Sequence, residues 1–239
     1  MNPILILHGW GGGSKSWLKV KDLLEQKGFT VFSPDMPGFG SAAPPSGPWN
    51  VQNYTDWVLD FAQQNKLEKF FLLGHSFGGR ISIKFAAQNY DKLKSLILVD
   101  SAGLQRSKNW SLKQRIIIEG SKIFRFLDKI PVLKIFYGFL RKATYFFSGT
   151  RDYYLIKDPA MKETFKNIIK EDLIDYLSAI KSETLIIWGE KDKLVPISVA
   201  YLLKEKITES KLEIFRDVGH NPQLECPERL VEEIIKFIK

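Results

Sequence analysis

Short runs of apolar and β-branched residues recur along the chain and alternate with longer amphipathic segments. Six runs have the length and composition of β-strands: 4–7, 29–33, 70–73, 95–99, 184–188 and 212–215. Helices are predicted between and after them, at 16–27, 51–65, 79–89, 197–207 and 227–238. Because the strand-like runs are continuously apolar, both faces of the sheet are expected to be buried. The pattern predicts an α/β fold with a doubly wound, mostly parallel sheet of about six strands.

One interval, 103–177, interrupts this alternation, because no strand-like run occurs in it. Apolar residues of 111–127 recur at helical spacing with basic residues between them, and Pro131 separates this segment from an aromatic-rich one at 132–147. Most of these rings are expected to form the insertion's own core, and some to face the main domain. We therefore predict a core domain at 1–102 and 178–239, with 103–177 as an inserted helical lid.

Composition indicates an ordinary globular protein. The 239 residues suffice for one α/β domain with a lid, and they are 44% hydrophobic and 26% charged. No apolar run approaches the roughly 18–20 residues that span a bilayer, and the apolar N-terminus lacks the basic region of a signal peptide. A cytoplasmic location without stable membrane insertion is expected. The single cysteine, Cys226, excludes an internal disulfide, and no Cys/His spacing indicates a metal site.

Positive charge is concentrated in the interrupted interval. The net charge is +8, and 110–165 contains 11 Lys and Arg against 5 Asp and Glu. Such a surface can attract an acidic substrate, an acidic carrier protein or anionic lipid, although a solvated face is the simpler interpretation. No helix-turn-helix, RNP-like or zinc-finger pattern is found, so no nucleic-acid partner is expected.

The most specific motif is G-H-S-F-G at 74–78, between a predicted strand and a predicted helix. A sharp turn from strand to helix forces its central serine into a strained backbone conformation, and glycines on both sides avoid clashes. The turn would hold the Ser76 hydroxyl above the sheet, near the positive end of the following helix. G-x-S-x-G alone is a weak signal, but in this context it makes Ser76 the candidate nucleophile.

A serine hydroxyl needs a base to take its proton, and the sequence contains only three histidines. His75 lies inside the turn and is expected to point away from the Ser76 side chain. His8 ends the first strand and is expected to brace the glycine-rich loop that follows. His220 lies on a loop after the last strand, so elimination makes it the candidate base.

The base needs a carboxylate that fixes its tautomer and stabilises the imidazolium. Asp192 follows the run 184–188, at the carboxyl end of a strand, where open α/β sheets place their sites. Two alternatives are Asp100, at the end of the neighbouring strand, and Glu190, in the same turn as Asp192. Asp192 is the preferred acid.

A developing oxyanion needs fixed donors. The backbone N–H groups of Phe77, at the start of the helix, and of Trp10, in the loop at 8–12, are the predicted pair. This loop lacks the residues of a P-loop and the spacing of a dinucleotide-binding motif, so no cofactor is expected. A further motif, D-M-P-G-F-G-S at 35–41, is interpreted as a tight loop in which Asp35 accepts hydrogen bonds from local amides.

Together these motifs resemble those of the α/β-hydrolase superfamily over nearly the whole chain. The loop at 8–11 is similar to the family's oxyanion loop, 74–78 to its nucleophile elbow, 189–196 to its acid turn and 219–222 to its histidine loop. The resemblance implies a serine hydrolase with a catalytic triad, an oxyanion hole and a cap domain. The Trp after His8-Gly9 and the lid resemble carboxylesterases such as pimeloyl-carrier-protein methyl esterases, which act on an acidic carrier through a basic lid.

Departures from the family narrow the activity. Epoxide hydrolases and haloalkane dehalogenases carry Asp at the position of Ser76, and carbon–carbon hydrolases often carry Trp where this sequence has Asn221. The sequence begins at the strand that is third in the family, so the usual leading hairpin is expected to be absent. The run 29–33 would then lie near an exposed edge, and a homodimer formed through that edge is a further hypothesis.

The resulting prediction is a carboxylesterase that acts through an acyl-enzyme on an ester with a small to medium apolar acyl or aryl group. Carbon–carbon bond hydrolysis of a vinylogous 1,5-diketone, and thioester or lactone hydrolysis, are alternatives that use the same triad. A small-ligand sensor without turnover, and a lipase that binds a membrane surface through 111–127, are alternatives of other classes.

Overall fold

The computed structural model describes residues 2–104 and 156–239. The lid segments predicted at 111–127 and 132–147 lie outside the described residues. Residues from Asp158 to the end form one compact unit with Met1–Leu104, apart from Gln105–Lys157. The domain boundary proposed for the lid therefore stays a prediction.

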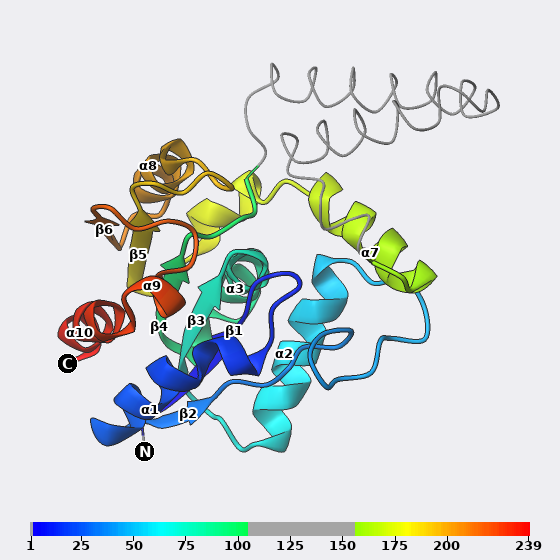
Figure 1. Cartoon of the computed structure of the whole chain (residues 1–239), viewed down its shortest axis with the longest axis horizontal. Helices are drawn as coiled ribbons and strands as arrows, with labels where there is room; N and C mark the ends of the chain where they lie inside the picture. The colour runs from blue at the N-terminus through cyan, green and yellow to red at the C-terminus, as the bar shows by residue number, and fades with distance from the viewer. Residues whose placement is uncertain (1, 105–155) are drawn as a thin grey trace, which may run out of the picture. The chain divides into compact units, whose positions relative to one another are not determined.

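A parallel sheet of six strands forms the centre of this unit (Figure 1). Its strands are β1 (Pro3–Leu7), β2 (Thr30–Phe32), β3 (Phe70–His75), β4 (Leu93–Val99), β5 (Thr184–Gly189) and β6 (Ser210–Phe215). They are ordered β2-β1-β3-β4-β5-β6, and every neighbouring pair is parallel. The predicted fold class is confirmed. The chain direction across the sheet reverses between β1 and β3, and ligands of open α/β sheets bind at such a switch point.

Helices cover both faces of the sheet (Figure 1). On one face, α1 (Leu18–Gln26) packs beside α10 (Pro227–Ile238). On the other lie α2 (Val51–Gln64), α3 (Phe77–Gln88) and α8 (Ile197–Lys206). The shorter helices are η1 (Ser14–Trp17), η2 (Tyr90–Lys92), η3 (Ile174–Ala179) and α9 (Pro222–Glu225). No helix within residues 2–104 and 156–239 combines the length and hydropathy that a membrane-spanning helix requires.

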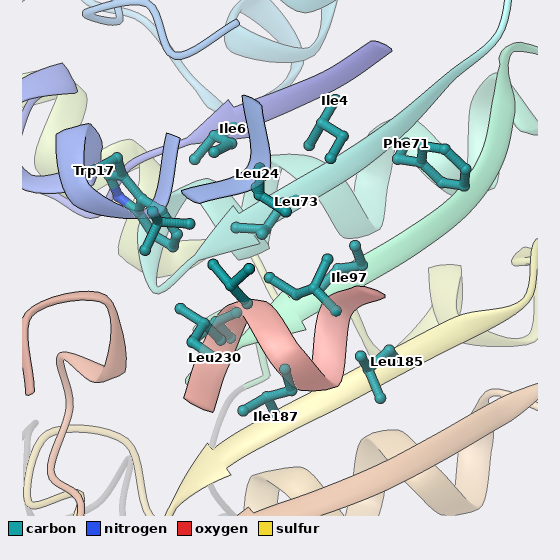
Figure 2. Close-up of a cluster of buried hydrophobic side chains, with 14 of the residues drawn as sticks. Ile4, Ile6, Trp17, Leu24, Phe71, Leu73, Ile97, Leu185, Ile187 and Leu230 are labelled. Carbon is teal, nitrogen blue, oxygen red and sulfur yellow. The ribbon is translucent and has the colours of Figure 1, made fainter. Parts of the chain in front are cut away.

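Alternate residues of each strand point to opposite faces, so continuously apolar strands bury both. In β3, Phe71 and Leu73 join the core beneath α1 and α10, whereas the Phe70 ring contacts Phe85 of α3. Figure 2 shows Leu230 of α10 and Ile187 of β5 in one cluster of buried side chains. Each such fully buried aliphatic side chain contributes roughly 1.5–3 kcal/mol. The core thereby holds the carboxyl ends of the strands in a fixed relation.

Two buried cations on α3 attach another helix, α7 (Pro159–Lys170), to the domain. Arg80 donates from Nη1 to the carbonyl oxygens of Ile168 (2.8 Å) and Glu171 (2.5 Å), at the C-terminal end of α7. Lys84 pairs with the Glu171 carboxylate at 2.5 Å. Because the last carbonyls of a helix lack intrahelical donors, these contacts satisfy them and attach the C-terminal end of α7 to α3, the helix that follows Ser76.

The predicted strand at 29–33 is shorter in the structure, Thr30–Phe32, and it lies at the edge of the sheet. Among the described strands it pairs with β1 alone, through Thr30, Val31 and Phe32. A short edge strand is one way in which proteins limit unwanted pairing. The homodimer through this edge stays a prediction.

Candidate active site

The turn at Ser76 has the strained geometry that its sequence predicts. Ser76 has φ 52° and ψ −111°, a backbone conformation that residues other than glycine rarely adopt. A side chain at Gly74 would collide with the Ser82 hydroxyl, and one at Gly78 with the Leu7 carbonyl. Glycine is therefore required on both sides because α3 passes so close to β1 and β3.

Hydrogen bonds to β4, to the segment after β4 and to α3 fix the Ser76 backbone. Its amide donates to the Val99 carbonyl (3.1 Å), and its carbonyl accepts from the amides of Ala102 (3.0 Å) and Arg80 (3.2 Å). These backbone bonds hold the Ser76 hydroxyl at the carboxyl edge of the sheet and leave its oxygen free to react.

The structure brings Ser76, His220 and Asp192 into one hydrogen-bonded chain. His220 Nε2 lies 3.0 Å from Ser76 Oγ, and His220 Nδ1 lies 2.7 Å from Asp192 Oδ2. The carboxylate can only accept at this contact, so Nδ1 carries the ring proton and Nε2 is left as the acceptor. The side chains of His220 and Asp192 are 10% and 0% exposed. This arrangement can remove a proton from the Ser76 hydroxyl.

Asp192 is held in its ionised form. Burial by itself raises the pKa of Asp192, but the hydrogen bond and charge of His220 and the amides of Val195 and Leu194 outweigh it, so the pKa is lowered. Both amides donate to Oδ1, at 3.0 and 2.7 Å. The carboxylate that faces His220 is therefore available as an anion at neutral pH.

The loop that carries His220 is held by two groups that sequence reasoning did not assign to the site. Glu225 accepts hydrogen bonds from the amides on both sides of the histidine, Gly219 (2.7 Å) and Asn221 (3.1 Å). His75 Nε2 lies 2.7 Å from the His220 carbonyl oxygen. Glu225 lies in α9, five residues after the histidine, and no sequence motif pointed to its contacts.

His75 contacts the base through its ring as well as through its nitrogen. The two imidazole rings lie 4.9 Å apart, and His75 is 4% exposed. Burial lowers the pKa of His75 to about 3, and the charge of His220 acts in the same direction. His75 is consequently neutral, and it donates Nε2–H to the His220 carbonyl.

The two alternative acids occupy different positions. Glu190 accepts from the Asp217 amide at 3.3 Å and makes no hydrogen bond to His220 in the described part of the chain. Asp100 is fully buried, and its Oδ1 accepts from the Gly189 amide at 2.9 Å. Asp100 therefore lies behind Asp192, and of the three candidate acids only Asp192 is hydrogen-bonded to His220 in the described structure.

The loop after β1 lies against the Ser76 turn. The Gly78 amide donates to the His8 carbonyl (3.1 Å), and a Cβ added at Gly9 would lie 3.3 Å from Ser76 Cβ. Among the described residues, the amides of Trp10 and Phe77 donate to no acceptor. Both predicted oxyanion donors are thus unpaired, on the two segments that meet beside Ser76.

His8 braces this loop, as predicted. Its Nδ1 lies 2.8 Å from the Gly9 carbonyl and its Nε2 accepts from the Met36 amide at 3.1 Å. Asp35 accepts hydrogen bonds from the amide and hydroxyl of Ser41, both at 2.8 Å. It also accepts from the amide of Ser14, 21 residues away in the sequence, at 2.6 Å. The local hydrogen bonding predicted for Asp35 is confirmed, and the bond to Ser14 additionally ties two loops together.

Aromatic side chains surround the ring of Trp10. Its contacts are edge-on, with centroid distances of 4.8 Å to Phe39, 5.2 Å to Phe77 and 5.0 Å to Phe165. Phe165 reaches this cluster from α7. Some rings of 103–177 were expected to face the main domain, but no pattern in the sequence indicated that Phe165 would meet Trp10, Phe39 and Phe77.

One group of three potential metal ligands occurs within the described residues: Asp100, Asp192 and His220. Both ring nitrogens of His220 are already engaged, by Asp192 and by Ser76. The group therefore fits proton transfer, and its donors match no tetrahedral or octahedral ligand set.

Comparison with known proteins finds hydrolases of similar sequence and fold. Lipase 1 of Psychrobacter immobilis is 27% identical over 98% of this chain and 76% of its own length. The 2-hydroxymuconate semialdehyde hydrolase of Pseudomonas sp. (strain CF600) is 25% identical over 99% of this chain and 86% of its own. Among solved structures, an esterase from Exiguobacterium antarcticum has a TM-score of 0.77 and 24% identity, over 100% of this chain and 92% of that one.

A family model described as the alpha/beta hydrolase fold matches residues 2–125 and 137–227. The match includes the sheet and every loop that carries Ser76, Asp192 and His220. This chain therefore belongs to the α/β hydrolase fold family.

Proposed function

We propose that this protein is a serine carboxylesterase in which Ser76 is the nucleophile, His220 the general base and Asp192 the acid that orients it. The observation that carries the proposal is the hydrogen-bonded chain from Ser76 Oγ through His220 to Asp192, at 3.0 and 2.7 Å. Relatives named as lipases support ester hydrolysis as the reaction class.

In acylation, Ser76 Oγ attacks the ester carbonyl carbon while His220 Nε2 takes the hydroxyl proton. Asp192 remains ionised and stabilises the imidazolium. The carbonyl oxygen becomes an oxyanion, and the N–H groups of Trp10 and Phe77 donate to it. The tetrahedral intermediate collapses, the ester C–O bond breaks, and His220 gives its proton to the departing alkoxide. An acyl-enzyme and a free alcohol result.

In deacylation, water takes the place of the alcohol. His220 removes a proton from it as the oxygen attacks the acyl carbon, and the same two amides bind the second oxyanion. Collapse breaks the bond to Ser76 Oγ, which recovers its proton from His220. The products are a carboxylic acid and the free enzyme, so one water is consumed in each cycle.

The aromatic cluster around Trp10 supports an apolar substrate group. Trp10 and Phe165 are partly exposed, so their rings can offer an apolar surface beside the reacting carbonyl. We infer a small to medium acyl or aryl group as the part of the ester that is bound there. An acidic carrier attached to the substrate stays a further hypothesis, since it rests on the charge of 110–165.

Carbon–carbon bond hydrolysis of a vinylogous 1,5-diketone is the second candidate. The observation that favours it is the similarity to the 2-hydroxymuconate semialdehyde hydrolase, over 86% of that protein. The same nucleophile and base would serve both reactions, so the choice depends on the substrate groups that the enzyme accepts.

Steady-state hydrolysis of p-nitrophenyl esters from acetate to palmitate, by wild type and Ser76→Ala, tests the first candidate. Multiple turnover that disappears in the variant is expected, with an optimum at short or medium chains. No turnover, or activity that survives the substitution, would reject the esterase assignment. Vinylogous diketones would then be the next substrates, followed by ligand-binding assays for a sensor.

A further inference from the structure

A second carboxyl group lies directly behind the acid of the triad. Asp100 directly follows β4, with 0% of its surface exposed, and has φ 42°, a conformation that costs energy for a residue with a side chain. Its Oδ1 accepts from the amide of Gly189, the last residue of β5. Asp100 therefore connects the ends of two neighbouring strands, immediately before the turn that carries Asp192.

The two carboxyl groups are too close to ionise independently. One oxygen of Asp100, one oxygen of Asp192 and one ring nitrogen of His220 all lie within 4.8 Å of one another. The titratable groups whose charge interacts with Asp100 are Asp192 after β5, His220 after β6, and Glu225 and Cys226 at the end of α9. Like charges at such a distance in a buried site strongly disfavour double ionisation, so one of the pair retains a proton.

The hydrogen bonds identify which carboxyl group is protonated. Asp192 accepts from His220 and from two backbone amides, all of which stabilise its anion. Asp100 accepts from one amide, and its Oδ2 is buried with no donor among the described residues. An oxygen without a donor is poorly suited to negative charge, but as a hydroxyl it becomes a donor itself.

We propose that Asp100 is a positioning residue, protonated at neutral pH, whose Oδ2–H donates to the Asp192 carboxylate while its Oδ1 accepts from Gly189. Burial raises the pKa of Asp100 to about 9, and the charge of Asp192 adds to this against the Gly189 amide. The pair then carries a single negative charge, located on the member that faces His220. This inference rests on the proposed function, because it assigns Asp100 a role in orienting the acid of the triad.

The protonation state can be measured without any substrate. Carbon-13 NMR of the whole protein, with labelled aspartate side-chain carboxyl carbons, would be followed from pH 4 to 10, and Asp100 assigned from the signal lost in Asp100→Asn. A carboxyl signal that stays protonated through pH 7 and titrates near 9 supports the proposal. Titration of the Asp100 signal below pH 5 overturns it.

Kinetics then test the positioning role. Asn reproduces the shape and charge of a protonated Asp, so Asp100→Asn is expected to keep kcat within about threefold of wild type. The apparent pKa on the acid limb of the pH–kcat/KM profile should stay nearly unchanged. Were Asp100 ionised, this substitution would remove a charge near His220 and lower that pKa by about one unit or more, which would overturn the proposal.

Asp100→Ala removes both hydrogen bonds and should lower kcat about tenfold or more, with KM little changed, because Asp192 is no longer held in place. Glu190→Gln is the control, since it removes a carboxylate from the turn that carries Asp192 and should leave kcat unchanged. Wild-type kcat in Asp100→Ala would contradict the positioning role.

If that variant does not fold, Asp100→Asn and the titration decide the question. Failure of wild type to hydrolyse any ester would reject the proposed function, whereas the titration would still decide the protonation of Asp100.

Discussion

His75 donates a hydrogen bond from Nε2 to the carbonyl oxygen of His220, at 2.7 Å, across 145 residues of sequence. Because His75 directly precedes Ser76, the same turn that presents the nucleophile also supports the loop of the base. Nucleophile and base are thereby positioned by one rigid element. Such preorganisation limits the motion that would otherwise lengthen the Ser76–His220 contact.

Replacing His75 should therefore impair both stability and activity. His75→Phe keeps a buried ring but leaves the His220 carbonyl without its donor, at a cost of about 1–3 kcal/mol. We expect kcat to fall about tenfold. His75→Gln, which retains an N–H donor, is the control and should recover part of both losses. Urea unfolding and ester hydrolysis measure the two effects, and equal behaviour of the two variants would contradict the role of the hydrogen bond.

Glu225 should matter to catalysis although it does not touch Ser76. Its two carboxylate oxygens accept from the amides on either side of His220. In Glu225→Gln one oxygen becomes an NH₂ group, which cannot accept, so the loop loses one of these bonds. We expect kcat to fall about tenfold and KM to change little.

The control for Glu225 is Glu228→Gln, a substitution three residues further along, in the first turn of α10. Glu228 pairs with Lys19 at the surface, at 3.3 Å with both side chains more than half exposed. An exposed pair of this kind contributes little, so this variant should behave as wild type. A comparable loss of kcat in both variants would indicate a general charge effect, not a specific contact.

Gly78→Ala should disrupt the turn itself. The added methyl group would meet the backbone carbonyl oxygens of Leu7, the last residue of β1, and of His8, which follows it. Overpacking typically costs about 1–3 kcal/mol, and a shift of α3 would also displace the Phe77 amide. Loss of most activity and a lower Tm are expected. Gly47→Ala, which meets open space, should leave both unchanged.

The side chain of Trp10 should influence substrate choice more than rate. Its proposed catalytic contribution comes from the backbone N–H, which Trp10→Leu retains, whereas the ring contacts with Phe39 and Phe77 are lost. We expect a change in the preferred acyl chain length with a drop in kcat of less than about tenfold on the best ester. An unchanged chain-length profile would show that this ring does not contact the substrate.

The protonated Asp100 predicts how stability depends on pH. Its pKa is raised from 3.8 to about 9 on folding, so between these values the folded state binds more protons than the unfolded state. The stabilisation is complete below the unfolded pKa and is lost as pH rises, with a slope of up to about 1.4 kcal/mol per pH unit.

The window from pH 7 to 9 isolates this effect from His75. Since the pKa of His75 is lowered by folding, from 6.5 to about 3, its contribution is complete above 6.5 and is lost only in acid. The free energy of unfolding should therefore fall between pH 7 and 9 in wild type and fall less steeply in Asp100→Asn. Parallel curves in guanidinium titrations of the two proteins would contradict the assignment.

The strands and helices followed from the sequence because hydrophobic periodicity is a local property. Each predicted strand lies within about two residues of an observed one, and the order of elements specified a parallel sheet. Ser76, His220 and Asp192 could also be proposed in advance, since a nucleophile needs a particular turn and only three histidines could serve it. Local pattern and elementary chemistry carried these predictions.

The supports of the site were decided by the tertiary structure alone. Asp100 meets the Gly189 amide across 89 residues, and Phe165 reaches Trp10 from a helix held by Arg80. No periodicity marks such contacts, because they arise when the register of a parallel sheet brings the ends of separate strands to one edge. Whether a buried carboxyl holds a proton depends on those neighbours, so its chemistry appears only once the chain has folded.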